Sequence, residues 1–228
     1  MSETINKSQV LVTRSKLERI ADAIRYKYGG QKPAPQPELV ADIYFTSEGV
    51  KDRVRKYFRG GSYDNIVDDE FYFNNDYNEY SFNTRFTFNQ GFEYDIYIEM
   101  GEVNTNRQPS WSTKFLTNAI DNSYIIGYSN NSWVSHSSGG WDYNLDFIPN
   151  DINYFSNKTI HLKKKQRTDA RDNPFAYSIF IEDVEYMLAD DSTASDILFG
   201  TANSRDGNTF TGMKIKSIKI YAKKEVTE

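Results

Sequence analysis

The strictest pattern in this chain is the alternation of apolar and polar residues over positions 92–100, which requires a β-strand. One side of that strand carries apolar residues, namely Phe92, Tyr94, Ile96, Ile98 and Met100. The other side carries Glu93, Asp95, Tyr97 and Glu99. Because successive side chains of a strand point to opposite faces, the apolar row must face a core and the acidic row must face outward. We therefore expect a sheet with one buried face.

Further segments with strand composition follow at short and fairly even intervals. An alternating run over 82–88 precedes Asn89-Gln90-Gly91, which predicts a hairpin turn into the strand at 92–100. The other expected strands are 113–116, 124–128, 133–136, 142–147, 159–164, 177–182, 184–188 and 210–221. Aromatic residues make up 15% of the chain, and Tyr and Phe suit pleated surfaces. These patterns predict a mainly β protein, an antiparallel β-sandwich or jelly roll.

The first 45 residues have a different pattern. Ser15 and Glu18 have the spacing of a capping box, and apolar residues recur at helical spacing until Gly29-Gly30. The Pro-rich segment 32–37 predicts a stiff spacer, and a second short helix is expected over 38–43. We expect residues 1–45 to be a helical adaptor, and residues 60–228 to be the sandwich.

Charge is distributed unevenly along the chain. Residues 60–157 hold 3 Lys/Arg against 14 Asp/Glu, whereas residues 1–59 hold 12 against 7 and residues 158–228 hold 12 against 11. A strongly acidic middle argues against nucleic acid and against an anionic membrane surface as partners. The chain has no cysteine, so neither disulfides nor Cys-based zinc sites are available. No cofactor and no metal site is expected from the sequence motifs.

The C-terminal half resembles the concanavalin A-like, or laminin G-like, domains. The resemblance is carried by the segments TIHL at 159–162, YSIFIEDVEY at 177–186, ILFGTAN at 197–203 and FTGMKIKSIKIY at 210–221. It implies a lectin-like jelly roll over residues 75–222. Asp183 departs from the family, which commonly has Gly in that tight turn. The apolar phase of the last strand shifts between Ile215 and Ile218, which predicts a β-bulge near Ser217.

The N-terminal segment has a resemblance of its own. Residues 16–25, a following Gly and the closing segment 39–43 resemble a small helical module of tail and baseplate proteins from phages of Gram-positive bacteria. That resemblance implies a virion protein, assembled in the host cytoplasm, which contacts other virion proteins through its N-terminal helices. A homo-oligomer is also compatible with it.

Catalysis is not expected. The chain has two histidines, His136 and His161, and we expect His161 to be structural because it lies within an alternating strand. The acidic row Glu93, Asp95, Glu99 has the period of the glycosidases of the concanavalin-like superfamily, with Tyr97 interrupting it. Glu93 and Glu99 would lie roughly 20 Å apart on one strand, too far for a retaining pair.

Tryptophans beside Asn, Ser and Gly are the best candidates for a binding site. An exposed Trp can stack on the apolar face of a sugar ring while amides and carboxylates bind its hydroxyls. The expected ligand-binding residues are Trp111, Tyr128, Trp133, Trp141 and Asp142, together with Glu93, Asp95 and Tyr97 along a groove. Core packing is the alternative for each Trp.

The sequence thus predicts a non-catalytic phage virion protein of the tail, baseplate or fibre. Its lectin-like domain would bind a host cell-surface polysaccharide. One alternative is a structural or decoration protein that binds no glycan, and the other is a glycoside hydrolase.

Overall fold

The computed structural model describes the larger part of the chain outside its N-terminal segment. The described residues are 20, 21, 24, 36–45, 54–56, 66, 67, 70–72, 80–103, 113–118, 124–136, 142–166, 175–188, 197–199, 208, 209 and 213–224. The chain divides into two compact units, residues 37–225 and the remainder. None of the described residues belongs to a helix that is long and apolar enough to cross a membrane.

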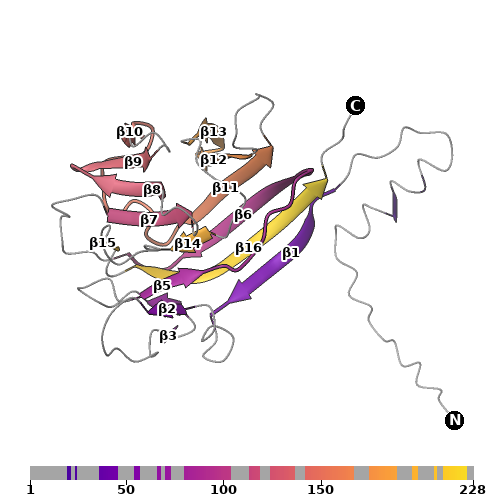
Figure 1. The fold of residues 1–228 in the computed structure, drawn as a ribbon, viewed down its shortest axis with the longest axis horizontal. Helices are drawn as coiled ribbons and strands as arrows, with labels where there is room; N and C mark the ends of the chain where they lie inside the picture. Colours follow the sequence, from indigo (N-terminus) through magenta and orange to yellow (C-terminus); the bar gives the residue numbers. More distant parts are fainter. Residues whose placement is uncertain are drawn as a thin grey trace, which may run out of the picture. The chain divides into compact units, whose positions relative to one another are not determined.

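The described part of residues 37–225 folds into two eight-stranded sheets (Figure 1). The β6 sheet consists of β1 (Glu38–Tyr44), β3 (Ile66–Val67), β4 (Glu70–Tyr72), β6 (Phe92–Met100), β11 (Thr159–Gln166), β12 (Phe175–Ile181), β13 (Val184–Met187) and β16 (Lys214–Lys224). The β7 sheet consists of β2 (Val54–Lys56), β5 (Tyr80–Asn83), β7 (Thr113–Asn118), β8 (Tyr124–Ser129), β9 (Ser132–His136), β10 (Asp142–Asn144), β14 (Ile197–Phe199) and β15 (Asn208–Thr209). All pairings between these described strands are antiparallel except that of β15 with β7.

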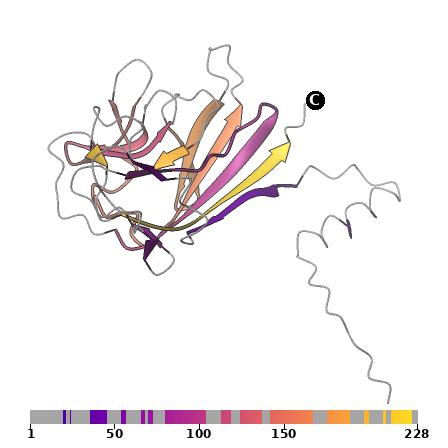
Figure 2. The same ribbon diagram turned by 60° about the horizontal axis from the view of Figure 1, so that its bottom comes forward.

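The strand order shows how the chain moves between the sheets. In the β6 sheet the order is β13-β12-β11-β6-β16-β4-β3, with β1 also paired to β16. Figure 2 shows the long strands β11, β6, β16 and β1 side by side. In the β7 sheet the order is β10-β9-β8-β7-β14-β5-β2. Of the strands in the C-terminal half, β11, β12, β13 and β16 belong to the β6 sheet and β14 belongs to the β7 sheet.

The core lies between the two sheets. The alternation over 92–100 aims Ile96 and Ile98 inward, and both are fully buried. They belong to one apolar cluster with residues of the β7 sheet such as Leu116, Ile126 and Phe199. The expected antiparallel β-sandwich is therefore confirmed.

Two local expectations are wrong. Residues 38–43 are not a helix but the edge strand β1, which pairs with β16 and places Ile43 in the core. The apolar spacing of the segment fits both structures, and pairing with the long strand β16 decides between them. Asn89-Gln90-Gly91 does not form a hairpin, because β5 and β6 lie in different sheets and residues 84–91 cross from one to the other.

Other local expectations are confirmed or refined. The register of β16 against β6 shifts between Ile215 and Ser217, as the change of apolar phase predicted. At the β12–β13 hairpin, Ile181 pairs with Val184, and Glu182 and Asp183 both have positive φ. The loop therefore has two residues with the backbone signs of a type I′ turn.

The segment expected to form the adaptor helix lies mostly outside the described residues. Ile20, Ala21 and Ile24 have helical conformation. The boundary between the two units falls at Pro37, earlier than the expected residue 45, because β1 belongs to the sandwich.

Candidate functional site

The outward side of the β6 sheet carries a dense set of polar and aromatic side chains. On β6 the buried residues Tyr94, Ile96 and Ile98 alternate with Glu93, Asp95, Tyr97 and Glu99, which are half-buried or exposed. The outward orientation of the acidic row is therefore confirmed. We use the term polar face for this side of the sheet, defined by Glu93, Asp95, Tyr97, Glu99, His161, Lys163, Lys165, Ser178, Phe180, Glu185, Lys219, Tyr221 and Lys223.

An aromatic row crosses the centre of the polar face. Tyr97 on β6 is in register with His161 on β11, and His161 is in register with Phe180 on β12. The rings of Tyr97 and His161 stack at 4.3 Å, and those of His161 and Phe180 stack at 4.2 Å. Tyr221 on β16 meets Tyr97 edge-on at 5.8 Å. Four strands thus hold one continuous row of rings.

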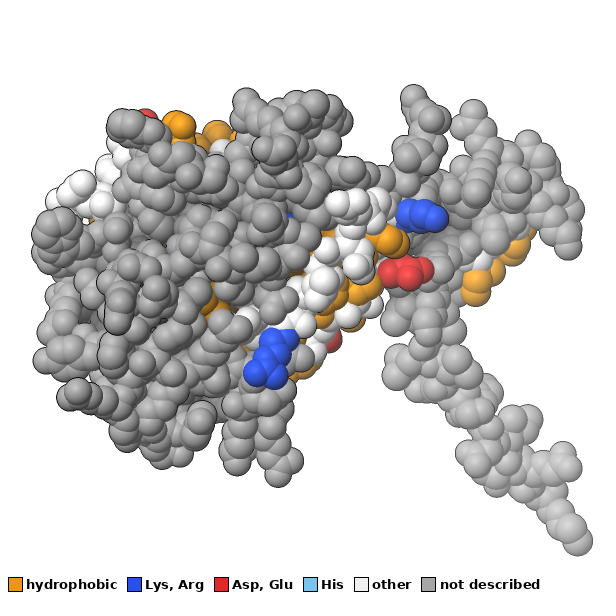
Figure 3. Space-filling view, viewed as in Figure 1, with side chains coloured by type: hydrophobic (Ala, Val, Ile, Leu, Met, Phe, Trp, Pro, Cys, Tyr) orange, Lys and Arg blue, Asp and Glu red, His pale blue; other side chains and the backbone are white. Residues whose placement is uncertain are grey.

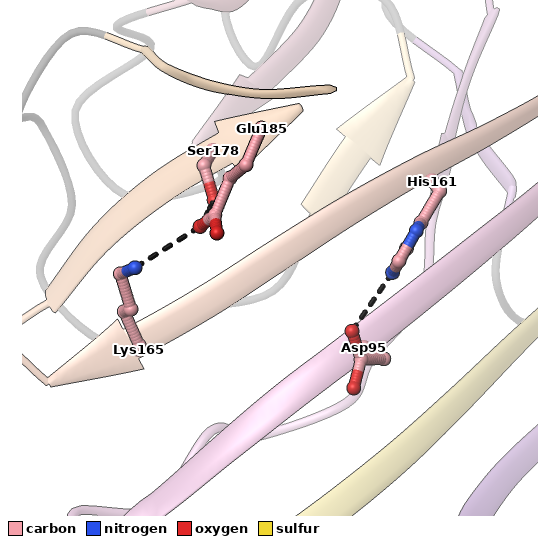
Figure 4. A network of polar contacts seen from close by, with 5 residues as sticks. All are labelled: Asp95, His161, Lys165, Ser178 and Glu185. Carbon is pink, nitrogen blue, oxygen red and sulfur yellow. Dashed lines mark hydrogen bonds and ion pairs between the residues drawn. The ribbon is translucent and has the colours of Figure 1, made fainter. Parts of the chain in front are cut away.

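The central ring of the row is oriented by a carboxylate. His161 Nε2 lies 2.8 Å from Asp95 Oδ1, and both side chains are about one quarter exposed (Figure 4). A hydrogen bond to Asp95 places the proton of a neutral imidazole on Nε2. Asp95 and the two neighbouring rings therefore restrain the His161 side chain from three sides.

A second polar network joins three strands (Figure 4). Glu185 on β13 accepts a hydrogen bond of 2.6 Å from Ser178 Oγ on β12 and one of 3.0 Å from Lys165 Nζ on β11. The Ser178 hydrogen bond, and after it the Lys165 ammonium group, lower the pKa of Glu185 although partial burial opposes them. This carboxylate is therefore ionised and held in place.

The pKa of the Tyr97 hydroxyl group is shifted by its surroundings in the aromatic row. Desolvation, the negative charge of Asp95 and the nearby Tyr221 raise the pKa of Tyr97 above its ordinary value. Its hydroxyl group therefore stays protonated at neutral pH and can donate a hydrogen bond.

Lysines lie beside the acidic row on both sides. Glu93 is in register with Lys223 on β16, and Asp95 is in register with Lys163 on β11. Glu99 accepts a hydrogen bond of 3.1 Å from Ser217 Oγ. In the single view of Figure 3, the few described charged side chains that are visible lie apart from one another. The acidic row of the sequence is therefore not an acidic patch in the fold.

Two of the expected ligand-binding aromatics lie in the core instead. Trp133 and Tyr128 are 1% and 4% exposed. Trp133 packs edge to face against Tyr128 at 5.2 Å and against Phe155 at 4.8 Å, and its Nε1 donates to the carbonyl of Asp151. The prediction interpreted the polar residues Asn130 and Asn131, which precede Trp133, as part of a ligand-binding loop. In the structure these two residues form the tight β8–β9 turn and have positive φ. Neither ring is available for stacking on a ligand.

For the remaining expected tryptophans and for Asp142, the structure describes no side chain. Trp111 and Trp141 lie outside the described residues, as do the side chains of Asp142 and His136, whose backbones belong to β10 and β9. The polar face brings Glu93, Asp95 and Tyr97 together with residues that the sequence did not single out. Among those are Phe180 and Tyr221, which only the strand pairing places beside Tyr97.

The polar face combines several kinds of polar and aromatic group. Its groups are hydroxyls, carboxylates, ammonium groups, one imidazole and one phenyl ring, all on strands of the β6 sheet. No cluster of three or more His, Asp or Glu that could hold a metal ion occurs among the described residues. The face is thus equipped to form many hydrogen bonds with a polar ligand.

Comparison with known proteins gives structural similarity alone. No family model matches the chain, and no curated protein does. One similar structure is domain 4 of AbnA, a GH43 extracellular arabinanase from Geobacillus stearothermophilus in complex with arabinotriose. It is 14% identical, 84% of this chain and 95% of that domain are covered, and the TM-score is 0.43.

Two further similar structures are binding domains. The binding domain of Botulinum neurotoxin serotype D is 15% identical, with 76% of this chain and 43% of that one covered and a TM-score of 0.38. The binding domain of Paraclostridial Mosquitocidal Protein 1 is 12% identical, with 85% and 45% covered and a TM-score of 0.37. The chain spans less than half the length of each of these two solved chains.

Proposed function

We propose that the sandwich is a carbohydrate-binding domain whose ligand lies on the polar face. The observation that carries this proposal is the row of Tyr97, His161 and Phe180, in which the rings are stacked at 4.3 and 4.2 Å and Asp95 holds the imidazole. A preorganised surface loses little conformational entropy when a ligand binds. Hydroxyl, amine and carboxylate groups around the row match the many hydroxyl groups of a saccharide.

We propose that the face binds without hydrolysis. A retaining glycosidase needs two carboxyl groups about 5 Å apart, and an acid among them that keeps its proton. Asp95 is engaged with His161, and Glu99 with Ser217. Glu93, Asp95 and Glu99 also lie on one strand at positions about 7 Å or more apart, beyond the separation of a retaining pair. A reducing-end assay on host wall polysaccharide tests this point, and turnover that disappears in Glu93→Gln or Asp95→Asn would establish an enzyme.

Removal of the aromatic row tests the binding proposal. We expect the full chain to be retained on insoluble polysaccharide, and Tyr97→Ala and Phe180→Ala each to weaken binding at least about tenfold, a loss of roughly 1.4 kcal/mol. The matched control is Tyr143→Ala, since Tyr143 is an exposed tyrosine of β10 in the other sheet. Circular dichroism checks that each variant is folded. Equal binding by all three variants would place the ligand elsewhere.

We further propose, as a finer assignment, that the protein is a phage virion component and that the ligand is a host surface polysaccharide. Its support is the resemblance of residues 16–25 to a tail and baseplate module, because residues 39–43 form β1 and no longer contribute. A mass-spectrometric inventory of purified particles tests it, and absence of the chain from every particle would contradict it.

A further inference from the structure

The charges of the polar face compensate one another. Lys223 lies opposite Glu93, and Lys163 lies opposite Asp95. At the edges, Asp42 on β1 is in register with Lys219, and Glu185 is bonded to Lys165. Cross-strand pairs of opposite charge are mutually stabilising. The polar face carries the carboxylates of Glu93, Asp95, Glu99 and Glu185 and the ammonium groups of Lys163, Lys165, Lys219 and Lys223, so these charges balance and leave no net charge to attract an ionic ligand.

Both faces of the central ring of the aromatic row are covered by its neighbours. Tyr97 covers one side of the His161 ring and Phe180 covers the other, with interplanar angles of 14° and 10°. Tyr221 stands at 87° to Tyr97, edge against ring. Rings that are stacked on each other present their edges to a ligand. A sugar could stack on the His161 ring only if Tyr97 or Phe180 moved away from it. The hydroxyl groups of Tyr97 and Tyr221 lie at such ring edges.

We infer that the saccharide bound by the polar face is uncharged, and that hydrogen bonds from the Tyr97 and Tyr221 hydroxyl groups hold it in preference to stacking on ring faces. This inference rests on the proposed function and adds to it the class of ligand and the mode of recognition. The balanced charges of the polar face are the reason for assigning an uncharged ligand. The covered faces of the His161 ring are the reason for assigning recognition through hydroxyl groups.

Affinity gel electrophoresis of the full chain tests both parts. The probes are arabinan, galactomannan and β-glucan as neutral polysaccharides, and polygalacturonate and alginate as anionic ones, each at low and high salt. We expect retardation by at least one neutral probe, unchanged by salt, since exposed ionic contacts are screened and neutral hydrogen bonds are not. Retardation by an anionic probe that weakens with salt would overturn the assignment to uncharged ligands and leave carbohydrate binding intact.

Single-atom changes test the mode of binding. Tyr97→Phe and Tyr221→Phe remove a hydroxyl group and keep the ring, so each should weaken binding about three- to tenfold, as expected for one hydrogen bond. Tyr143→Phe is the control, because it removes an exposed hydroxyl group from β10. Full affinity in Tyr97→Phe and Tyr221→Phe, with loss in Tyr97→Ala, would show stacking and overturn the inference. Failure to bind any probe would overturn the proposed function itself.

Discussion

Lys164 on β11 is a charged side chain enclosed in the core. It is 0% exposed, and its Nζ donates to Tyr177 Oη at 2.9 Å. The same nitrogen lies 4.2 Å from the centre of the Tyr177 ring and 4.7 Å from that of Phe88. Burial lowers the pKa of Lys164 from 10.5 to about 7. The residue therefore changes charge near neutrality.

Replacing Lys164 should stabilise the fold in a manner that depends on pH. The unfolded chain binds a proton at Lys164 up to about pH 10.5, whereas the folded chain releases it above about pH 7. The free energy of unfolding of the wild type should therefore rise as the pH increases from about 7, and be lowest below that value. Lys164→Met keeps the volume and removes the charge. We expect it to be more stable by about 2–3 kcal/mol near pH 6, with the difference shrinking towards pH 9.5.

Urea unfolding at several pH values measures this difference. Lys163→Met is the matched control, because Lys163 is the neighbouring lysine on the outward side of β11 and is only partly buried. It should show no comparable gain. A Lys164→Met protein that is less stable than the wild type at pH 6 would show that the ammonium group and its ring contacts stabilise the core.

The β12–β13 hairpin shows how an element tolerates unfavourable backbone angles. Glu182 and Asp183 have φ of 50° and 65°. These angles lie in the left-handed region, which residues other than Gly, Asn and Asp rarely adopt. The flanking pairs Ile181–Val184 and Ile179–Tyr186 hold the hairpin in register, and Phe147 stacks on Tyr186 at 4.0 Å. Strand pairing and this ring contact therefore offset the strain of the turn.

A turn sequence suited to these angles should stabilise the protein. Glu182→Asn with Asp183→Gly creates Asn-Gly, the preferred pair for a two-residue loop of this type. We expect an increase in the free energy of unfolding of about 1 kcal/mol, measured by thermal or urea unfolding. Glu182→Gln serves as control, since it removes the charge and leaves the backbone preference unchanged. An equal gain in Glu182→Gln would assign the effect to charge and not to φ.

At the scale of the whole molecule, β1 belongs to the sandwich even though the residues before it form another unit. Ile43 and Phe45 are 6% and 1% exposed, and the Phe45 ring packs against Phe82 of β5 at 4.9 Å. The segment thus pairs with the β6 sheet through β1 and contributes Phe45 to the core beside the β7 sheet. Its removal would open a cavity and expose the edge of β16.

Two truncations separate the units. Deletion of residues 1–36 should leave a sandwich with nearly the melting temperature of the full chain. Deletion of residues 1–45 should cost several kcal/mol or cause aggregation, because loss of a buried Phe alone costs about 3–5 kcal/mol and an uncovered strand edge can pair with other chains. Equal melting temperatures for both truncations would show that β1 is dispensable. A marked loss already in the first would show that the N-terminal residues support the core.

Local patterns in the sequence were enough to predict the elements whose side chains alternate. The row from Phe92 to Met100, most of the other long strands and the bulge near Ser217 are of this kind, since alternation follows from strand geometry alone. Tertiary pairing decided the rest. It made residues 38–43 a strand, buried Trp133 and Tyr128, and placed lysines of β11 and β16 beside the acidic row. It also assembled Tyr97, His161, Phe180 and Tyr221 from four strands. Strand order depends on packing between residues far apart in the chain, and no local pattern contains it.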